Sequence, residues 1–149
     1  MKKIDYNTYE HNGKLYRRTY NASDTCKSCA FYHDDHACSA SDCEGHVFKE
    51  VKKKVYISGK VTGLPINDAR KMFSDAEDKI NSLDDQYIAV NPLKGEKEGC
   101  TWEYYMRKDI KLLVDCDYIY FLPNWQESRG ANLEMIIARQ LGIQTLIIG

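Results

Sequence analysis

The feature that most constrains the fold is a regular alternation of strand-like and helix-like segments that begins at residue 54. Apolar runs typical of strands occupy residues 54–58, 87–90, 117–122 and 144–148. Strands that alternate with helices favour a parallel sheet joined by right-handed crossovers. We therefore expect an α/β domain with a flavodoxin-like or Rossmann-like parallel sheet of four strands in the order 2-1-3-4.

Three helices are expected between these strands. Asn67 is a candidate N-cap for the first helix, and Thr101 is a candidate N-cap for a second helix that runs to about Val114. The third helix covers residues 131–141. The apolar face of the first helix recurs at steps of three and four, at Ala69, Met72, Phe73, Ala76, Ile80 and Leu83.

A pocket is expected at one edge of this sheet. In doubly wound sheets, ligands bind at the carboxyl ends of the strands where the winding reverses. Here that point lies between the first and third strands, where the loops of residues 59–63 and 123–130 emerge.

Asp109 interrupts an apolar stripe on the second helix, seven positions after Trp102. A carboxylate that faces a core is costly unless a cation such as Arg107 pairs with it or it reaches a solvated cleft. Two interpretations follow: a structural hydrogen-bonding or ion-pairing residue, or a general acid whose pKa is raised by its surroundings.

Glu134 is a second unusual carboxylate, about one turn into the apolar helix of residues 131–141. The helix dipole would favour its ionised form there, which suits a nucleophile. An ordinary acidic residue near a helix start is the alternative. Because this helix is apolar nearly all round, we expect the sheet on one side and a second subunit on the other, in a homodimer or larger homo-oligomer.

The cysteines and histidines predict a separate N-terminal module. All four histidines lie before residue 50, and the spacing Cys26-x2-Cys29-x8-Cys38-x4-Cys43 could supply four thiolates to a structural zinc ion. His33, His36 and His46 are possible substitute ligands, and a disulfide or a metal-free redox pair is the alternative.

Residues 14–20 and 46–51 around these cysteines alternate as strands do, so the module is expected to be small and β-rich. Few aliphatic residues are available for a core there, so the module would need a metal ion to stabilise its fold. We expect two domains, residues 1–50 and residues 51–149.

The composition and motifs of the chain argue against several classes of function. A net charge of −1 offers no basic field for duplex nucleic acid, and no apolar run is long enough to span a bilayer. The N-terminus has no secretory signal, so a cytoplasmic protein is expected. The loop of residues 59–63 is neither a Walker motif nor GxGxxG, which argues against an organic cofactor, and the absence of histidine after residue 50 argues against a catalytic triad.

The α/β part of the chain resembles the nucleoside 2-deoxyribosyltransferase superfamily, which includes the deoxynucleoside-5′-monophosphate N-glycosidases. The residues that carry the resemblance are YISGKVTG at 56–63, NP at 91–92, WEYYMRKDI at 102–110 and CDYIYFLPNWQESRGANLE at 116–134. Asp109 lies eight residues before Asp117, and Glu134 follows Asp117 by seventeen, separations similar to those in the family.

The resemblance implies a role for each matching residue. Glu134 would be the nucleophile, Asp109 the general acid or base-contacting residue, and Tyr56 would position Glu134 and the sugar. Ser128 matches the serine that holds the 5′-phosphate in the monophosphate glycosidases, where the transferases have an acidic residue. The remaining implied substrate-binding residues are Ser58, Gly59, Thr62, Gly63, Asp117, Arg129, Gly130 and Asn132.

The chain also departs from the family pattern. Gly130 of the usual G-x-G-x-E sequence is kept, but Asn132 replaces the second glycine, which leaves the substrate open. The function implied is hydrolysis or transfer at the N-glycosidic bond of a nucleotide or nucleoside. Two alternatives are a non-catalytic protein that sequesters a nucleotide, such as a signalling nucleotide, and an interaction protein that acts through its zinc module.

Overall fold

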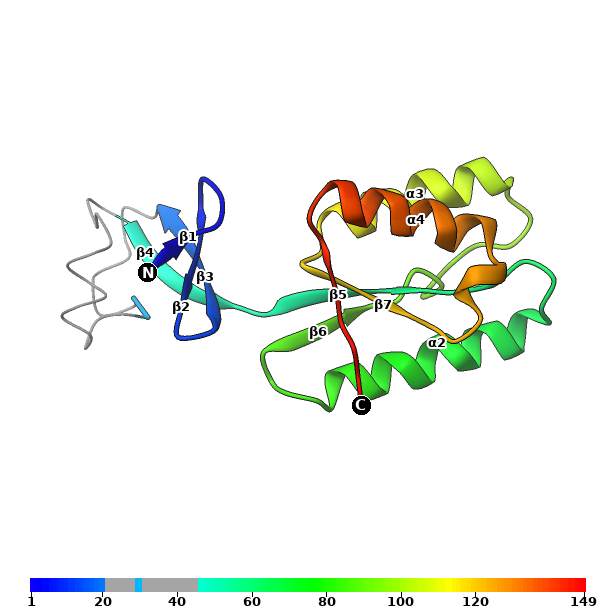
Figure 1. Ribbon diagram of the computed structural model, residues 1–149, viewed down its shortest axis with the longest axis horizontal. Coiled ribbons are helices and arrows are strands. Elements are labelled where there is room, and N and C mark those ends of the chain that lie inside the picture. Colours follow the sequence, from blue (N-terminus) through cyan, green and yellow to red (C-terminus); the bar gives the residue numbers. More distant parts are fainter. Residues whose placement is uncertain (21–28, 31–45) are drawn as a thin grey trace. The chain divides into compact units, whose positions relative to one another are not determined.

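A computed structural model describes residues 1–20, 29–30 and 46–149 of the chain. The chain divides into two compact units, Met1–Lys52 and Lys53–Gly149. Figure 1 shows the ribbon of both units with most of their elements labelled.

The first unit contains an antiparallel sheet in the order β1-β2-β3-β4. Its strands are β1 (Lys2–Lys3), β2 (Thr8–His11), β3 (Lys14–Tyr20) and β4 (His46–Val51). The strands predicted at residues 14–20 and 46–51 are confirmed. A small cluster of Tyr16 and Phe48, with Tyr9 and Cys29 against it, forms the described core of this unit.

The second unit is an α/β domain whose sheet is parallel throughout. Its strands are β5 (Lys53–Ser58), β6 (Tyr87–Val90), β7 (Tyr118–Phe121) and β8 (Gln144–Thr145), in the order β6-β5-β7-β8. Counted within this unit, the order is 2-1-3-4. The helices are α2 (Ile66–Asn81), α3 (Trp102–Val114) and α4 (Arg129–Gln140), with a short 3₁₀ turn η2 (Trp125–Glu127) before α4.

The two faces of β5 define two cores. Val55 and Ile57 pack with Phe73 and other residues of α2, whereas Tyr56, between them in sequence, packs with Leu113 of α3 and Ala138 of α4. This alternation follows from the period of two in a strand. Figure 1 shows α2 on one side of the sheet and α3 with α4 on the other.

The start of α3 was predicted correctly, and the limits of α2 were not. The hydroxyl of Thr101 accepts a hydrogen bond from the backbone N–H of Tyr104, which confirms it as the N-cap. Asn67 is not a cap, because α2 begins one residue earlier, at Ile66, after an N-cap Pro65 whose φ is −55°. Leu83 lies beyond the end of α2 and is exposed, so it does not belong to the apolar face.

Helix α4 leaves part of its apolar surface open to solvent. Ile136 is 53% exposed, and Leu141, the C-cap residue after the helix, is 58% exposed. The second subunit expected to cover this surface stays a prediction. Among the residues that the structure describes, no helix combines the length and apolarity that crossing a bilayer requires.

Candidate active site

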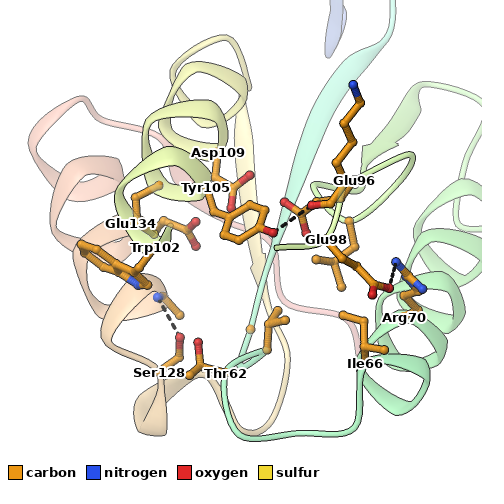
Figure 2. A pocket seen from close by; sticks show the side chains of 17 residues that line it. Thr62, Ile66, Arg70, Glu96, Glu98, Trp102, Tyr105, Asp109, Ser128 and Glu134 are labelled. Carbon is orange, nitrogen blue, oxygen red and sulfur yellow. Dashed lines mark hydrogen bonds and ion pairs between the residues drawn. The ribbon is translucent and has the colours of Figure 1, made fainter. Parts of the chain in front are cut away.

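A cavity of about 180 Å³ lies in the second unit at the carboxyl ends of its strands. Its walls come from the loop after β5, the first turns of α2, the segment of residues 93–98 after β6, helix α3 and the first half of α4. This is the edge of the sheet at which the winding pattern predicted a pocket. Figure 2 shows the labelled side chains of Asp109, Glu134 and Trp102 on one side of the cavity and those of Ile66 and Arg70 across from them.

Glu134 projects from α4 into this cavity and is only 5% exposed. Its Oε1 accepts a hydrogen bond of 2.7 Å from the hydroxyl of Tyr56, and its Oε2 accepts one of 2.5 Å from the hydroxyl of Ser58. Tyr56 and Ser58 are two positions apart on β5 and therefore share one face of the strand. The strand thus fixes both oxygens of the carboxylate.

Burial raises the pKa of Glu134 to about 7, although the hydrogen bonds from Ser58 and Tyr56 act to lower it. The nearby carboxylate of Asp109 raises the pKa further. The pKa of Glu134 thus moves in the direction opposite to the one expected from the helix dipole. Because α4 begins at Arg129, Glu134 lies beyond the first turn, where the dipole effect has faded and desolvation dominates.

Asp109 of α3 lines the same cavity. Its Oδ1 is buried and has no hydrogen-bond partner, and the ammonium of Lys108 lies 3.5 Å from it. Burial raises the pKa of Asp109 to about 6, against the opposing charge of Lys108. The neighbouring cation is therefore Lys108, whereas Arg107, the residue suggested by sequence, is exposed.

Four of the residues expected to bind substrate line the cavity: Gly59, Thr62, Ser128 and Gly130. Ser128 is also the N-cap of α4, because its Oγ accepts a hydrogen bond of 3.2 Å from the N–H of Ala131. Gly59 is required for close packing, since a Cβ there would lie 2.6 Å from Cδ1 of Leu122 and 3.0 Å from its Cβ.

The other expected substrate-binding residues do not line the cavity. Ser58, like Tyr56, holds Glu134 from the sheet. Gly63 forms a turn at a φ of +85°. Asp117 lies at the amino end of β7, the opposite edge of the sheet, where its Oδ2 accepts a hydrogen bond of 2.8 Å from the N–H of Lys54.

Arg129 and Asn132 also act away from the cavity. The guanidinium of Arg129 stacks on the ring of Trp102, 3.8 Å from the ring centre. The Asn132 amide donates hydrogen bonds of 2.9 Å and 2.7 Å to the carbonyl groups of Gln126 and Ser128. Asn132 therefore braces the loop before α4, and its replacement of a glycine does not narrow the pocket.

Residues 53–147 match the family model described as a domain of unknown function, DUF4406. The chain therefore belongs to the DUF4406 family. The match covers all the elements that form the cavity.

Two solved structures are similar to part of this DUF4406 protein. The 2-deoxyribosyltransferase of Bacillus psychrosaccharolyticus is 18% identical and aligns over 64% of this chain and 77% of its own, with a TM-score of 0.47. A conserved protein from Enterococcus faecalis V583 is 14% identical and aligns over 64% of this chain and 62% of its own, with a TM-score of 0.50. The latter alignment shows a shared α/β fold. No curated protein matches the chain.

Several cavity residues of the DUF4406 domain were not predicted as site residues. Trp102 was interpreted only as part of an apolar stripe, yet it lines the cavity with Tyr105 and Met106 of the same helix. The hydroxyl of Tyr105 donates to the carbonyl of Lys97 at 2.8 Å and accepts from the N–H of Cys100 at 3.0 Å. The helical periodicity of α3 shows which of its residues face inward. It does not show whether those residues face a packed core or a cavity.

The segment of residues 93–98 was also missed. Glu96 and Glu98 line the cavity, and each pairs with a cation from a different helix. Glu96 accepts from Lys108 of α3 at 2.6 Å, and Glu98 accepts from Arg70 of α2 at 2.9 Å. Nothing in the sequence of this loop indicates which helices it contacts.

The N-terminal cysteines lie outside the DUF4406 match. Cys26, Cys38 and Cys43 lie outside the described residues, so the predicted zinc site stays a prediction. Cys29 is described, and its Sγ accepts a hydrogen bond of 3.4 Å from the N–H of Phe48. A backbone N–H directed at the sulfur suits a metal-bound thiolate, because it stabilises the negative charge of the ligand.

Proposed function

We propose that the DUF4406 domain of this chain cleaves the N-glycosidic bond of a (deoxy)nucleoside 5′-monophosphate or a related nucleotide, with Glu134 as the nucleophile. The observation that carries the proposal is the placement of two carboxylates, the buried Glu134 and the partly buried Asp109, in one cavity with different partners. Two carboxylates with distinct surroundings are the machinery of retaining glycoside hydrolysis. The sequence resemblance assigns the same roles to the same two residues.

In the first step, an oxygen of ionised Glu134 attacks C1′ of the sugar while the bond from C1′ to the base nitrogen breaks. Protonated Asp109 gives its proton to the departing base, so the base leaves neutral and Asp109 becomes a carboxylate. In the second step, water attacks C1′, Asp109 takes its proton, and Glu134 is released. A second base that takes the place of water would make the reaction a transfer.

The hydrogen bonds of the site support this division of roles. Tyr56 and Ser58 donate to Glu134, and O–H donors favour its ionised form. Oδ1 of Asp109 has no hydrogen-bond partner, and burial favours the protonated form of this residue against the opposing charge of Lys108. The two hydrogen-bond donors on Glu134 suit a nucleophile. The absence of a donor to the buried Oδ1 of Asp109 suits a general acid.

The cavity also offers surfaces for the rest of a nucleotide. Trp102 and Tyr105 provide aromatic rings on which a base could stack, and Arg129 backs Trp102. Ser128 and Gly130 at the start of α4, with Gly59 and Thr62 on the facing loop, suit a phosphate, because hydroxyl and backbone N–H groups bind anions at a helix start. The serine at position 128 is the residue that favours a monophosphate over an uncharged nucleoside.

The proposal is tested by incubation of the protein with a panel of ribonucleoside and deoxyribonucleoside monophosphates and the corresponding nucleosides, followed by chromatography for free base. We expect base from at least one monophosphate and none with Glu134→Gln. A matched control is Glu127→Gln, because Glu127 is exposed and pairs with Lys60 on the protein surface. Tight binding that survives Glu134→Gln, with the nucleotide recovered intact, would instead support a sequestering protein.

We further propose a structural zinc ion held by Cys26, Cys29, Cys38 and Cys43, as their spacing indicates. The backbone hydrogen bond to Cys29 supports a thiolate at that position. Metal analysis of the purified chain should find one zinc per chain, with four thiols that react only after chelation. The absence of stoichiometric zinc, with fewer than four free thiols among these cysteines, would contradict the proposal.

A further inference from the structure

Lys108 occupies a position between two carboxylates of the cavity. Its ammonium donates to Oε1 of Glu96 at 2.6 Å and to the carbonyl of Pro92 at 2.8 Å, and it lies 3.5 Å from Oδ1 of Asp109. Lys108 and Asp109 therefore form an ion pair without a hydrogen bond. Glu96 and the Pro92 carbonyl therefore hold the ammonium slightly away from Asp109.

The other charged groups around Asp109 come from every element that packs near it. Glu134 of α4 and Tyr56 of β5 lie on the sheet side, and the charges of Asp109 and Glu134 influence each other. Glu96 acts on Asp109 from the segment after β6. The two cations among the described residues that line the cavity are Arg70 of α2, which pairs with Glu98 at 2.9 Å, and Lys97 of the segment after β6. Lys108 is thus the cation that acts directly on Asp109.

We propose that Lys108, held in place by Glu96, is a positioning residue that governs when Asp109 loses its proton. This inference rests on the proposed function, in which protonated Asp109 gives its proton to the leaving base. The positive charge of Lys108 favours the carboxylate, and the negative charge of Glu96 opposes it both directly and by restraining Lys108. The two residues therefore push the proton affinity of Asp109 in opposite directions.

Opposite effects allow a test with two single variants. Removal of the cation in Lys108→Met should raise the pKa of Asp109 above about 6, and removal of the anion in Glu96→Gln should lower it. At a pH well above 7, the rate of base release follows the protonated fraction of Asp109. There we expect kcat/KM to rise about threefold to tenfold in Lys108→Met and to fall by a similar factor in Glu96→Gln.

At a pH well below both carboxylate pKa values, the rate follows the ionised fraction of Glu134 and should change little in either variant. The matched control is Lys94→Met, which removes a lysine that pairs with Glu77 at 2.7 Å and does not line this cavity. It should leave the whole pH profile unchanged. The double variant Lys108→Met with Glu96→Gln should lie between the two single variants, and it leaves no unpaired charge at Glu96 if Lys108→Met alone folds poorly.

A second measurement does not depend on turnover. Carbon-13 NMR of carboxyl-labelled aspartate, assigned with Asp109→Asn, reports the pKa of Asp109 directly in each variant. Shifts of opposite sign support the inference, whereas no shift, or shifts of the same sign, would overturn it. If no nucleotide releases base, the proposed function fails, and the NMR titration still decides whether Lys108 and Glu96 control the proton of Asp109.

Discussion

At the residue scale, the hydroxyls of two residues on β5 help to set the protonation state of Glu134. Burial of a carboxylate to 5% exposure would alone keep it protonated near neutral pH. The hydroxyls of Tyr56 and Ser58 counteract this, one on each oxygen, and the balance leaves the pKa of Glu134 at about 7. A nucleophile with this pKa is ionised in about half of the molecules at neutral pH.

Substitution Ser58→Ala should raise the pKa of Glu134 further, because it removes a hydrogen bond that lowers that pKa. The rate of base release at acidic pH depends on the ionised fraction of Glu134, so it should fall roughly tenfold, as expected for a hydrogen bond to a charged group. At alkaline pH, where Glu134 is ionised in both proteins, the rates should converge. The measurement is kcat/KM as a function of pH.

A matched control is Ser82→Ala, which removes an exposed hydroxyl that donates to the carbonyl of Lys79 at 2.9 Å. Its pH profile should equal that of the unmodified protein. A uniform loss of activity at every pH in Ser58→Ala would contradict a role in setting the charge of Glu134 and would indicate distortion of the site.

The sequence predicted some of these residue roles and could not predict others. Asp109 and Glu134 were found because a carboxylate in an apolar helical stripe is unusual and because their spacing matches a known family. Ser58 was expected to contact substrate, and Lys108 and Glu96 were not predicted at all. Their partners are fixed by how the loop after β6 meets α3, which is a tertiary contact with no local sequence pattern.

At the element scale, α3 positions Asp109, and its start is secured by Thr101. The Thr101 hydroxyl accepts the N–H of Tyr104, and Tyr105 ties the same turn to the preceding loop. Substitution Thr101→Ala should therefore lower the free energy of unfolding by about 1 kcal/mol, the usual contribution of a helix cap. Urea unfolding followed by circular dichroism measures this change.

The control for this prediction is Asn67→Ala at the start of α2. Asn67 lies inside the helix after an N-cap proline and makes no capping hydrogen bond. We expect the substitution to leave the free energy of unfolding within about 0.5 kcal/mol of the unmodified protein. Equal losses in the two variants would show that Thr101 does not act as a cap.

The two helix starts also show where sequence patterns succeed at this scale. A threonine just before an apolar helical stripe predicted the start of α3 correctly. The same logic failed at α2, because Pro65 already provides a backbone conformation suited to a helix start and the asparagine falls within the first turn. An N-cap is therefore predictable from sequence where only one residue near the helix start is suited to that position.

At the scale of the whole molecule, the two raised carboxylate pKa values link stability to pH. Asp109 and Glu134 bind protons more tightly in the folded state than in the unfolded chain, whose values are near 3.8 and 4.5. The unfolded state therefore binds fewer protons between pH 4 and 7, and the stability due to these groups falls as the pH rises through about 6 and 7.

We expect the double variant Asp109→Asn with Glu134→Gln to lose this dependence. Relative to the variant, the unmodified protein should lose on the order of a few kcal/mol of unfolding free energy between pH 4 and 7. Urea unfolding of both proteins across this range measures the difference, in which the other titrating groups cancel. A difference that is constant with pH, or that grows in the opposite direction, would contradict the raised pKa values.

The sequence also predicted the architecture better than the cavity. Alternating apolar runs gave the four parallel strands and the edge at which the pocket lies, because strand and helix periods are local properties. The far wall of the cavity depends on Glu98 and Arg70, which meet across 28 positions of chain. Such contacts follow from the packed fold and not from any periodicity.

The central claim is that Glu134 attacks the sugar of a nucleotide, and a fluorinated substrate tests it most directly. Fluorine at C2′ destabilises the oxocarbenium-like transition state of both steps, so a covalent glycosyl-enzyme should accumulate if a carboxylate is the nucleophile. Mass spectrometry of the protein quenched after incubation with a 2′-fluoro analogue of the cleaved monophosphate should find the sugar phosphate on the peptide that contains Glu134. An adduct on another residue, or base release with no adduct and no loss in Glu134→Gln, would contradict the claim.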